Sequence, residues 1–142
     1  MNTHKRPQVL YVEDNTDSFE MLQVMLAAER IDLQSAGSIA EGLAKAGAQR
    51  FDLYLLDSGL PDGNGFSLCR ILRAIDPDVP VLFYSGNAYP AEIKVAMAAG
   101  AHGYITKPHS EKLAETILHL VATHREEPVA KAFLPVFISA AA

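Results

Sequence analysis

The sequence predicts an α/β domain with a doubly wound sheet of five parallel strands and five helices. Short apolar runs alternate along the chain with segments of helical periodicity. Such alternation implies a parallel sheet whose right-handed crossovers place helices on both faces. The length of 142 residues suits one domain, since a domain contains roughly 100–200 residues.

Five short apolar runs are predicted to be strands. Asp52–Asp57 is apolar throughout its interior, which favours a strand buried on both faces. Ile31–Ala36 alternates apolar and polar residues instead, the period of a half-buried strand. Pro80 is compatible with the fourth run because it stands near the beginning. In chain order, the predicted strands are Gln8–Glu13, Ile31–Ala36, Asp52–Asp57, Val79–Tyr84 and His102–Thr106.

The segments between and after these runs are predicted to be helices. Phe19, Leu22 and Leu26 recur at i, i+3 and i+7, which indicates one apolar helix face. Ser38 followed by Glu41 is typical of a capping box. The predicted helices are Asp17–Glu29, the segment from Ser38 to about Gln49, Phe66–Ile75, Pro90–Ala99, and Ser110–Arg125 with Ser110 as its cap.

Composition excludes several other classes of protein. Hydrophobic residues make up 49% and charged residues 20%, which is typical of a globular chain. The single cysteine, Cys69, cannot form an intrachain disulfide, which suits the cytoplasm. The net charge of −5 argues against direct nucleic-acid binding. No apolar run approaches the ~20 residues of a membrane-spanning helix, so we expect no membrane partner.

Polar residues with reactive side chains follow four of the five predicted strands. Glu13 and Asp14 end the first strand, Asp57 the third and Ser85 the fourth, and Lys107 follows the fifth. Because the carboxyl ends of parallel strands meet at one edge of a sheet, we expect a ligand site there. Three neighbouring carboxylates repel one another, so either their pKa values are raised or they require a cation, for which Mg²⁺ is suited.

This set of groups favours phosphoryl transfer. A carboxylate can act as a nucleophile and form an aspartyl phosphate. Transfer of a phosphoryl group depends mainly on positioning and on neutralisation of charge. A metal ion, a lysine and a hydroxyl donor around an aspartate would position the phosphoryl group and neutralise its charge.

With these residues in view, the chain resembles the receiver domain of two-component response regulators, and in particular chemotaxis-regulator-like receivers. The resemblance covers about residues 7–125. Each short motif is weak alone, but their order and spacing on five alternating units make the match strong. The matching motifs are YVEDN with Glu13 and Asp14, DSGLPDGNG with Asp57, Pro61 and Gly65, FYSGN with Ser85, and GYITKP with Tyr104, Lys107 and Pro108.

The resemblance implies a flavodoxin-like fold with strand order 2-1-3-4-5 and a phosphoacceptor at Asp57. It also implies an Mg²⁺ site. Asp14 and Asp57 would bind the ion directly, Glu13 closely or through water, and the backbone carbonyl of Gly59 would add a ligand.

The resemblance assigns the remaining site residues as well. Ser85 would donate a hydrogen bond to a phosphoryl oxygen once its loop moves in, and Lys107 would make a charge-assisted contact to the same group. The Lys107–Pro108 peptide bond is expected to be cis, since cis bonds are largely confined to X–Pro. Tyr104 would be a switch residue that turns from exposed to buried.

By resemblance, the expected function is a phosphorylation-dependent switch in a two-component system or phosphorelay. The phosphoryl donor would be a sensor histidine kinase or a phosphotransfer protein. The chain would catalyse only its own phosphorylation and dephosphorylation, and the face around residues 88–95 and 102–104 would bind an unknown downstream protein. The expected receiver domain is 1–127. The tail 128–142, with no recognisable output domain, could pack on it, mediate a homodimer or be disordered.

Two other functions are compatible with parts of the pattern. A haloacid-dehalogenase-type phosphatase also ends a strand with a nucleophilic aspartate and uses Mg²⁺ and lysine, but Gly59 stands where it has a second acid. A degenerate receiver would bind partners without phosphorylation. The complete set Glu13, Asp14, Asp57, Ser85 and Lys107 argues against that alternative.

Overall fold

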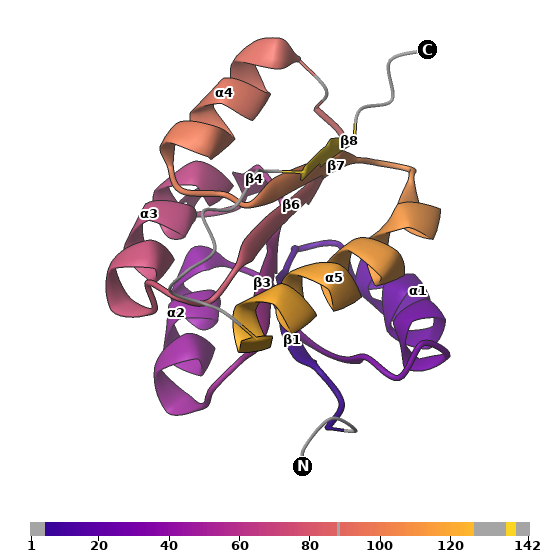
Figure 1. Ribbon diagram of the computed structural model, residues 1–142. Coiled ribbons are helices and arrows are strands. Elements are labelled where there is room, and N and C mark those ends of the chain that lie inside the picture. Colours follow the sequence, from indigo (N-terminus) through magenta and orange to yellow (C-terminus); the bar gives the residue numbers. More distant parts are fainter. Residues whose placement is uncertain (1–4, 88, 127–135, 139–142) are drawn as a thin grey trace.

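The computed structural model describes residues 5–87, 89–126 and 136–138, in which helices flank a parallel sheet (Figure 1). The strands of this sheet are β1 (Gln8–Val12), β2 (Asp32–Ala36), β3 (Leu53–Leu56), β6 (Val81–Ser85), β7 (Gly103–Thr106) and β8 (Val136–Ile138). The helices are α1 (Thr16–Ala27), α2 (Ile39–Ala48), α3 (Gly65–Ile75), α4 (Pro90–Ala98) and α5 (Leu113–Glu126). A small hairpin consists of β4 (Gly59–Leu60) and β5 (Gly63–Asn64).

The strand order of the main sheet is β2-β1-β3-β6-β7-β8, and every neighbouring pair is parallel. The first five strands of this order confirm the predicted doubly wound topology. The chain reverses its direction across the sheet after β2, so that β1 and β3 lie side by side at the point of reversal. Ligand sites of open α/β sheets are found beyond the carboxyl ends of strands at such a point.

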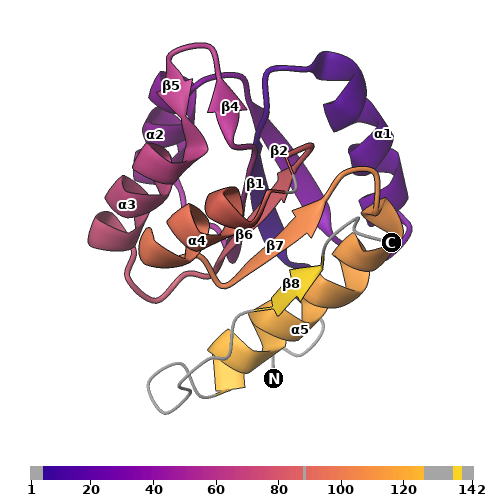
Figure 2. The same cartoon turned by 90° about the horizontal axis from the view of Figure 1, so that it is seen from above.

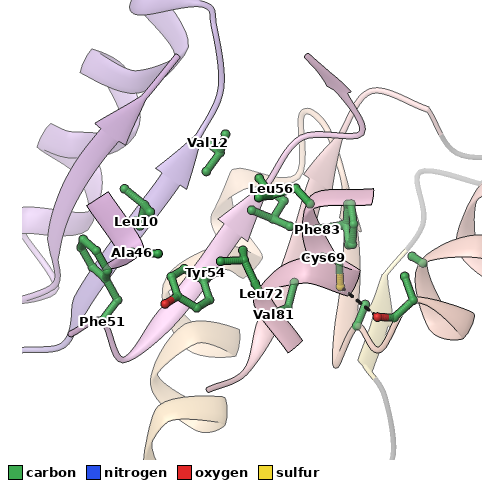
Figure 3. Packing of buried hydrophobic residues seen from close by; sticks show 14 of the residues in the cluster. Leu10, Val12, Ala46, Phe51, Tyr54, Leu56, Cys69, Leu72, Val81 and Phe83 are labelled. Carbon is green, nitrogen blue, oxygen red and sulfur yellow. Dashed lines mark hydrogen bonds between the residues drawn. The ribbon is translucent and has the colours of Figure 1, made fainter. Parts of the chain in front are cut away.

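The sheet separates two apolar layers. Figure 2 shows α1 and α5 on one side of it and α2, α3 and α4 on the other. Side chains alternate between the layers along a strand: Val9 and Tyr11 pack toward α1 and α5, and Leu10 and Val12 toward the other three helices. Figure 3 shows part of this second layer. All of Leu53–Leu56 is buried, as its continuous apolarity predicts. Within the described ranges, no helix is long and apolar enough to cross a membrane.

Polar side chains mark the beginnings of three helices. The predicted capping box at Ser38 forms only in part. The Ser38 hydroxyl accepts a hydrogen bond from the Glu41 backbone N–H at 3.1 Å, but the Glu41 carboxylate accepts from the N–H of Gly37 rather than from that of Ser38. The side chains that cap α1, α2 and α3 are those of Asn15, Ser38 and Asn64.

Two local features differ from the prediction. The segment between Asp57 and Phe66, to which the sequence pattern assigns no strand or helix, contains the antiparallel pair β4–β5, which is too short for a periodicity to reveal. Asp62 in its turn accepts hydrogen bonds from the N–H groups of Ile39 and Ala40 at 2.8 and 3.1 Å, so the hairpin is tied to the start of α2. The prediction that Ser110 caps the last helix is wrong, because Ser110 begins a short 3₁₀ turn that precedes α5.

The predicted tail 128–142 lies outside the described residues except for Val136–Ile138. These three residues form β8, which extends the sheet beyond β7 in parallel orientation. Phe137 is in register with Tyr104. This part of the tail therefore adds a strand to the five that were predicted.

Candidate functional site

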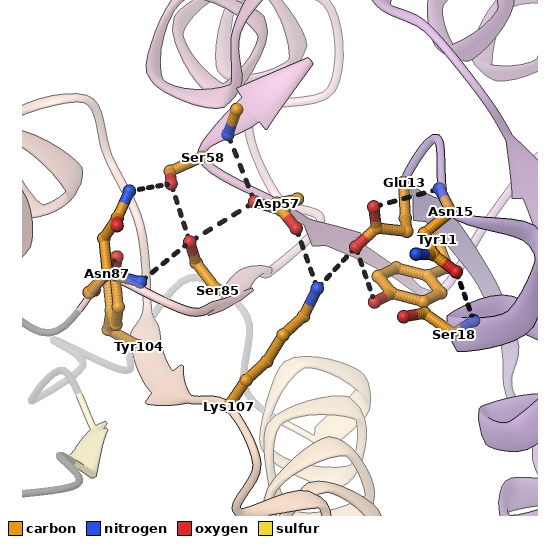
Figure 4. Close-up of polar contacts among 11 residues, drawn as sticks. Tyr11, Glu13, Asn15, Ser18, Asp57, Ser58, Ser85, Asn87, Tyr104 and Lys107 are labelled. Atoms are coloured by element: carbon orange, nitrogen blue, oxygen red, sulfur yellow. Dashed lines mark hydrogen bonds and ion pairs between the residues drawn. The ribbon is translucent and has the colours of Figure 1, made fainter.

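A connected group of polar side chains lies at the carboxyl end of the sheet (Figure 4). Asp57 directly follows β3, and its backbone N–H donates to the carbonyl of Val12 in β1 at 3.1 Å. Ser85 is the last residue of β6, and its carbonyl accepts from the N–H of Lys107 at 2.8 Å. The pairing of the strands thus brings together residues that are distant in the sequence.

Lys107 bridges two carboxylates. Its Nζ lies 2.9 Å from Oδ2 of Asp57 and 2.5 Å from Oε1 of Glu13, and 5.5 Å from the centre of the Tyr84 ring. Burial opposes the charge of Lys107, but the hydrogen bonds to both carboxylates outweigh it and raise its pKa. The Lys107–Pro108 peptide bond is cis.

The two carboxylates have different protonation behaviour. Glu13 is 6% exposed, and it accepts hydrogen bonds from the Tyr11 hydroxyl and the Asn15 N–H. Burial and the nearby carboxylate of Asp57 raise the pKa of Glu13. Burial also opposes ionisation of Asp57, but hydrogen bonds with Glu13 and Lys107 hold its pKa below the usual value. Asp57 therefore carries the negative charge that a carboxylate nucleophile requires.

Ser58 belongs to this group, although it was not predicted. Its Oγ lies 2.6 Å from Oγ of Ser85 and accepts from the side-chain amide of Asn87 at 3.3 Å. The Ser85 hydroxyl also lies 3.3 Å from Oδ1 of Asp57. The sequence offers only its position directly after the predicted nucleophile as a signal, because the alternation of side chains along a strand would point Ser58 away from Asp57.

Tyr104, the predicted switch residue, is fully buried in this structure. Its hydroxyl donates to the backbone carbonyl of Asn87 at 2.6 Å, and its ring stacks on Phe83 at 5.7 Å between centroids. Burial raises the pKa of Tyr104. The inward position expected to follow phosphorylation is thus present in the structure described here.

Two glycines hold the backbone around Asp57. A Cβ on Gly65 would lie 2.0 Å from the carbonyl oxygen of Asp57, so the close approach of α3 to this loop requires glycine. The N–H of Gly65 donates to the Ser58 carbonyl at 2.8 Å. Gly59 is exposed, and its N–H donates to Oδ1 of Asp57 at 3.1 Å.

The residues predicted to bind a metal are only partly gathered. Glu13 and Asp57 converge on Lys107, whereas Asp14 is exposed. Among the described residues, no group of three or more His, Cys, Asp or Glu side chains is arranged to hold a metal ion. Two converging carboxylates nevertheless fit Mg²⁺, which proteins bind through one or two carboxylates while it keeps several waters. The ammonium of Lys107 supplies the counter-charge in this structure.

Comparison with known proteins identifies the family. The sequence model of the response regulator receiver domain matches residues 9–118, and the chain therefore belongs to this family, whose members act as signalling switches. The DNA-binding response regulator MtrA of Mycobacterium tuberculosis is 35% identical over 107 residues, which is 75% of this chain and 46% of MtrA. The transcriptional regulatory protein CreB of Escherichia coli is 35% identical over 108 residues, which is 76% of this chain and 47% of CreB. The chain spans about half the length of these relatives.

Solved structures agree with this assignment. A CheY-like receiver domain protein from Methanospirillum hungatei superimposes with a TM-score of 0.81 at 28% identity, and the match covers 87% of this chain and 99% of that one. The chemotaxis response regulator CheY4 of Vibrio cholerae gives 0.76 at 27% identity, with coverage of 82% and 99%. The likeness extends over nearly the whole of both neighbours.

Proposed function

We propose that the chain is a phosphorylation-dependent switch that accepts a phosphoryl group on Asp57 from a histidine kinase or phosphotransfer protein in the cytoplasm. The observation that carries this proposal is the surroundings of Asp57. Its carboxylate contacts the Lys107 ammonium, the Ser85 hydroxyl and the Gly59 N–H at once. These groups are the positive charge and hydrogen-bond donors that phosphoryl oxygens require.

In the proposed reaction, a carboxylate oxygen of Asp57 attacks the phosphorus of a phosphohistidine. The P–O bond forms, the P–N bond breaks, and the released imidazole takes up a proton from solvent. The low pKa of Asp57 keeps the nucleophile ionised. Bound Mg²⁺ would offset the charge of the incoming phosphoryl group, and the residues proposed to hold it are Glu13, Asp14, Asp57 and the carbonyl of Gly59.

Phosphorylation would redistribute the contacts of Lys107 and Ser85. The phosphoryl group adds roughly −1.5 to −2 charge at neutral pH, so Lys107 would leave one of its present carboxylate partners. The Ser85 hydroxyl would turn from Ser58 toward a phosphoryl oxygen. Since Ser58 also bonds to Asn87, whose carbonyl accepts from Tyr104, the change would reach the face formed by α4, β7 and α5.

The expected shift of this face is partial when no partner is bound. A change from 1:99 to 99:1 requires about 5.5 kcal/mol of differential stabilisation. One hydrogen bond to a charged group contributes about 1.5–3 kcal/mol. The contact with Lys107, the metal ion and a downstream protein would therefore supply the remainder.

The test is Mg²⁺-dependent labelling by a small phosphodonor such as acetyl phosphate, followed by intact-mass spectrometry. We expect the mass of one phosphoryl group on the full chain, its loss in Asp57→Asn and its loss when EDTA removes the metal. Asp17→Asn, which neutralises an exposed acid in the first turn of α1, should be labelled normally. Equal labelling of Asp57→Asn would refute the proposal.

The same experiment separates the two alternatives. An aspartate-nucleophile phosphatase would release phosphate continuously from a monoester such as p-nitrophenyl phosphate. A degenerate receiver would remain unlabelled with every phosphodonor. Either result would replace the proposed function.

A further inference from the structure

The crossover from β7 to β8 has the opposite hand to the other crossovers of the sheet. From β6 to β7 the chain moves outward along the sheet through α4, which packs on the same face as α2 and α3. From β7 to β8 it continues in the same direction, but through α5, which packs on the opposite face beside α1 (Figure 2). Two parallel crossovers in one direction through opposite faces cannot have the same hand.

This difference in hand makes the β7–α5–β8 unit unfavourable within one chain. The four preceding crossovers share a single hand. Those from β2 to β3, β3 to β6 and β6 to β7 run in one direction through helices on one face, and that from β1 to β2 runs in the opposite direction through α1 on the opposite face. Parallel crossovers are right-handed in about 98% of cases, since the twist of the strands lets a helix pack back on the sheet only in that way. A return from α5 to the outer edge of β7 would be left-handed.

The pairing of the two strands is itself favourable. Without β8, the outer edge of β7 would present unpaired N–H and C=O groups, which readily pair with another strand. The register joins Gly103 to Val136, Tyr104 to Phe137 and Ile105 to Ile138. Val, Phe and Ile are residue types enriched in strands. The pairing of β8 with the outer edge of β7 is therefore favourable, whereas the left-handed crossover that joins the two strands within one chain is unfavourable.

We propose that Val136–Ile138 pairs with β7 of a second copy of this chain, so that two copies exchange these strands in a symmetric homodimer. A strand supplied by another molecule forms no crossover with α5, so the handedness rule does not apply. Each copy gives one strand and receives one, as a two-fold interface requires. Residues 127–135 can span roughly 30 Å when extended. Beside this edge, α4 exposes Val95 and Met97 at 39% and 47%, apolar surface that a second copy can cover.

Sedimentation velocity over a concentration series tests the dimer. The full chain is expected to form dimers, and Phe137→Pro should raise their dissociation constant at least about tenfold, which corresponds to 1.4 kcal/mol, because proline at the centre of this three-residue strand holds φ away from the value of a parallel strand. Phe137→Leu keeps the backbone N–H and should behave as the wild type. A monomer at all concentrations, or equal dissociation constants for Phe137→Pro and Phe137→Leu, would overturn the proposal.

A second measurement shows which copy supplies the strand. Differently isotope-labelled chains are unfolded together, refolded and examined by isotope-filtered NMR. Backbone contacts between Tyr104 and Phe137 of different molecules would support exchange. The same contacts within one molecule only, or no contact between these residues, would refute it, even if a dimer formed through another surface. This outcome does not depend on phosphorylation of Asp57, so the inference can fail while the proposed function holds.

Discussion

The charge of Lys107 is expected to stabilise the folded, unphosphorylated protein, because it offsets the repulsion between two neighbouring carboxylates. Its ammonium contacts the carboxylates of Glu13 and Asp57 simultaneously. Lys107→Met keeps much of the apolar stem but removes the charge, so that two neighbouring carboxylates lose their shared cation. Free energies of unfolding measured with and without Asp57→Asn therefore report on this pairing.

The expected loss of unfolding free energy in Lys107→Met follows from the burial of the ion pair. Loss of one partner from a buried ion pair costs about 3–5 kcal/mol. The side chains of Lys107 and Asp57 are 25% and 14% exposed, so water screens part of the interaction, and about 2 kcal/mol is expected for Lys107→Met. In the Asp57→Asn background Lys107 has one carboxylate partner left, and the cost should fall to about 1 kcal/mol.

Urea titrations of the four proteins at pH 7 in EDTA provide the double-mutant cycle. The expected coupling between Lys107 and Asp57 is about 1 kcal/mol, with unchanged dependence of the unfolding free energy on urea. Mg²⁺ should reduce the cost of Lys107→Met in the Asp57 background, because a metal cation can replace the ammonium. The same cost of Lys107→Met in both backgrounds would show that Lys107 and Asp57 do not interact energetically.

Three other substitutions probe the surroundings of the site and the fold. Ser58→Ala removes a buried hydroxyl contact and should lower the unfolding free energy by about 1 kcal/mol in urea titrations; an unchanged value would contradict this role. Gly65→Ala would place a Cβ 2.0 Å from the Asp57 carbonyl, so a loss of about 1–3 kcal/mol and slower labelling by acetyl phosphate are expected, and wild-type values in both assays would count against the steric argument. Burial lowers the pKa of His102 from 6.5 to about 4, so the unfolded chain binds a proton first as the pH falls. About 3 kcal/mol of stability should therefore disappear between pH 6.5 and 4. His102→Gln should remove most of this acid dependence in pH-dependent urea titrations, whereas the exposed His119→Gln should not.

The fold could be predicted because local patterns and general topology agree. Apolar runs such as that of β3 are short, continuous and bounded by polar residues, and a helix follows each of the five predicted strands. The convergence of Asp57, Ser85 and Lys107 then follows from the parallel order of the strands, since each residue stands at a carboxyl end.

Other features depend on contacts that no local pattern contains. Ser58 acquires its place in the site from the hydroxyl of Ser85, which is 27 residues away. The exposed position of Asp14, one residue from the buried Glu13, reflects how the chain leaves β1 to enter α1. The three residues of β8 contain too little periodicity to select a partner strand.

The positions of the tyrosines allow changes in the site to be followed by near-ultraviolet absorption and fluorescence. The chain has five tyrosines and no tryptophan, so phenol rings dominate its near-ultraviolet absorption and emission. Tyr54 hydrogen-bonds to Asp76 outside the polar group of the site, so its contribution to the spectrum should stay constant, and Tyr89 is exposed. Three others touch groups of the site, namely Tyr11 at Glu13, Tyr84 at Lys107 and Tyr104 at Asn87. Rearrangement of these contacts can therefore be followed optically in the unlabelled, unmodified protein.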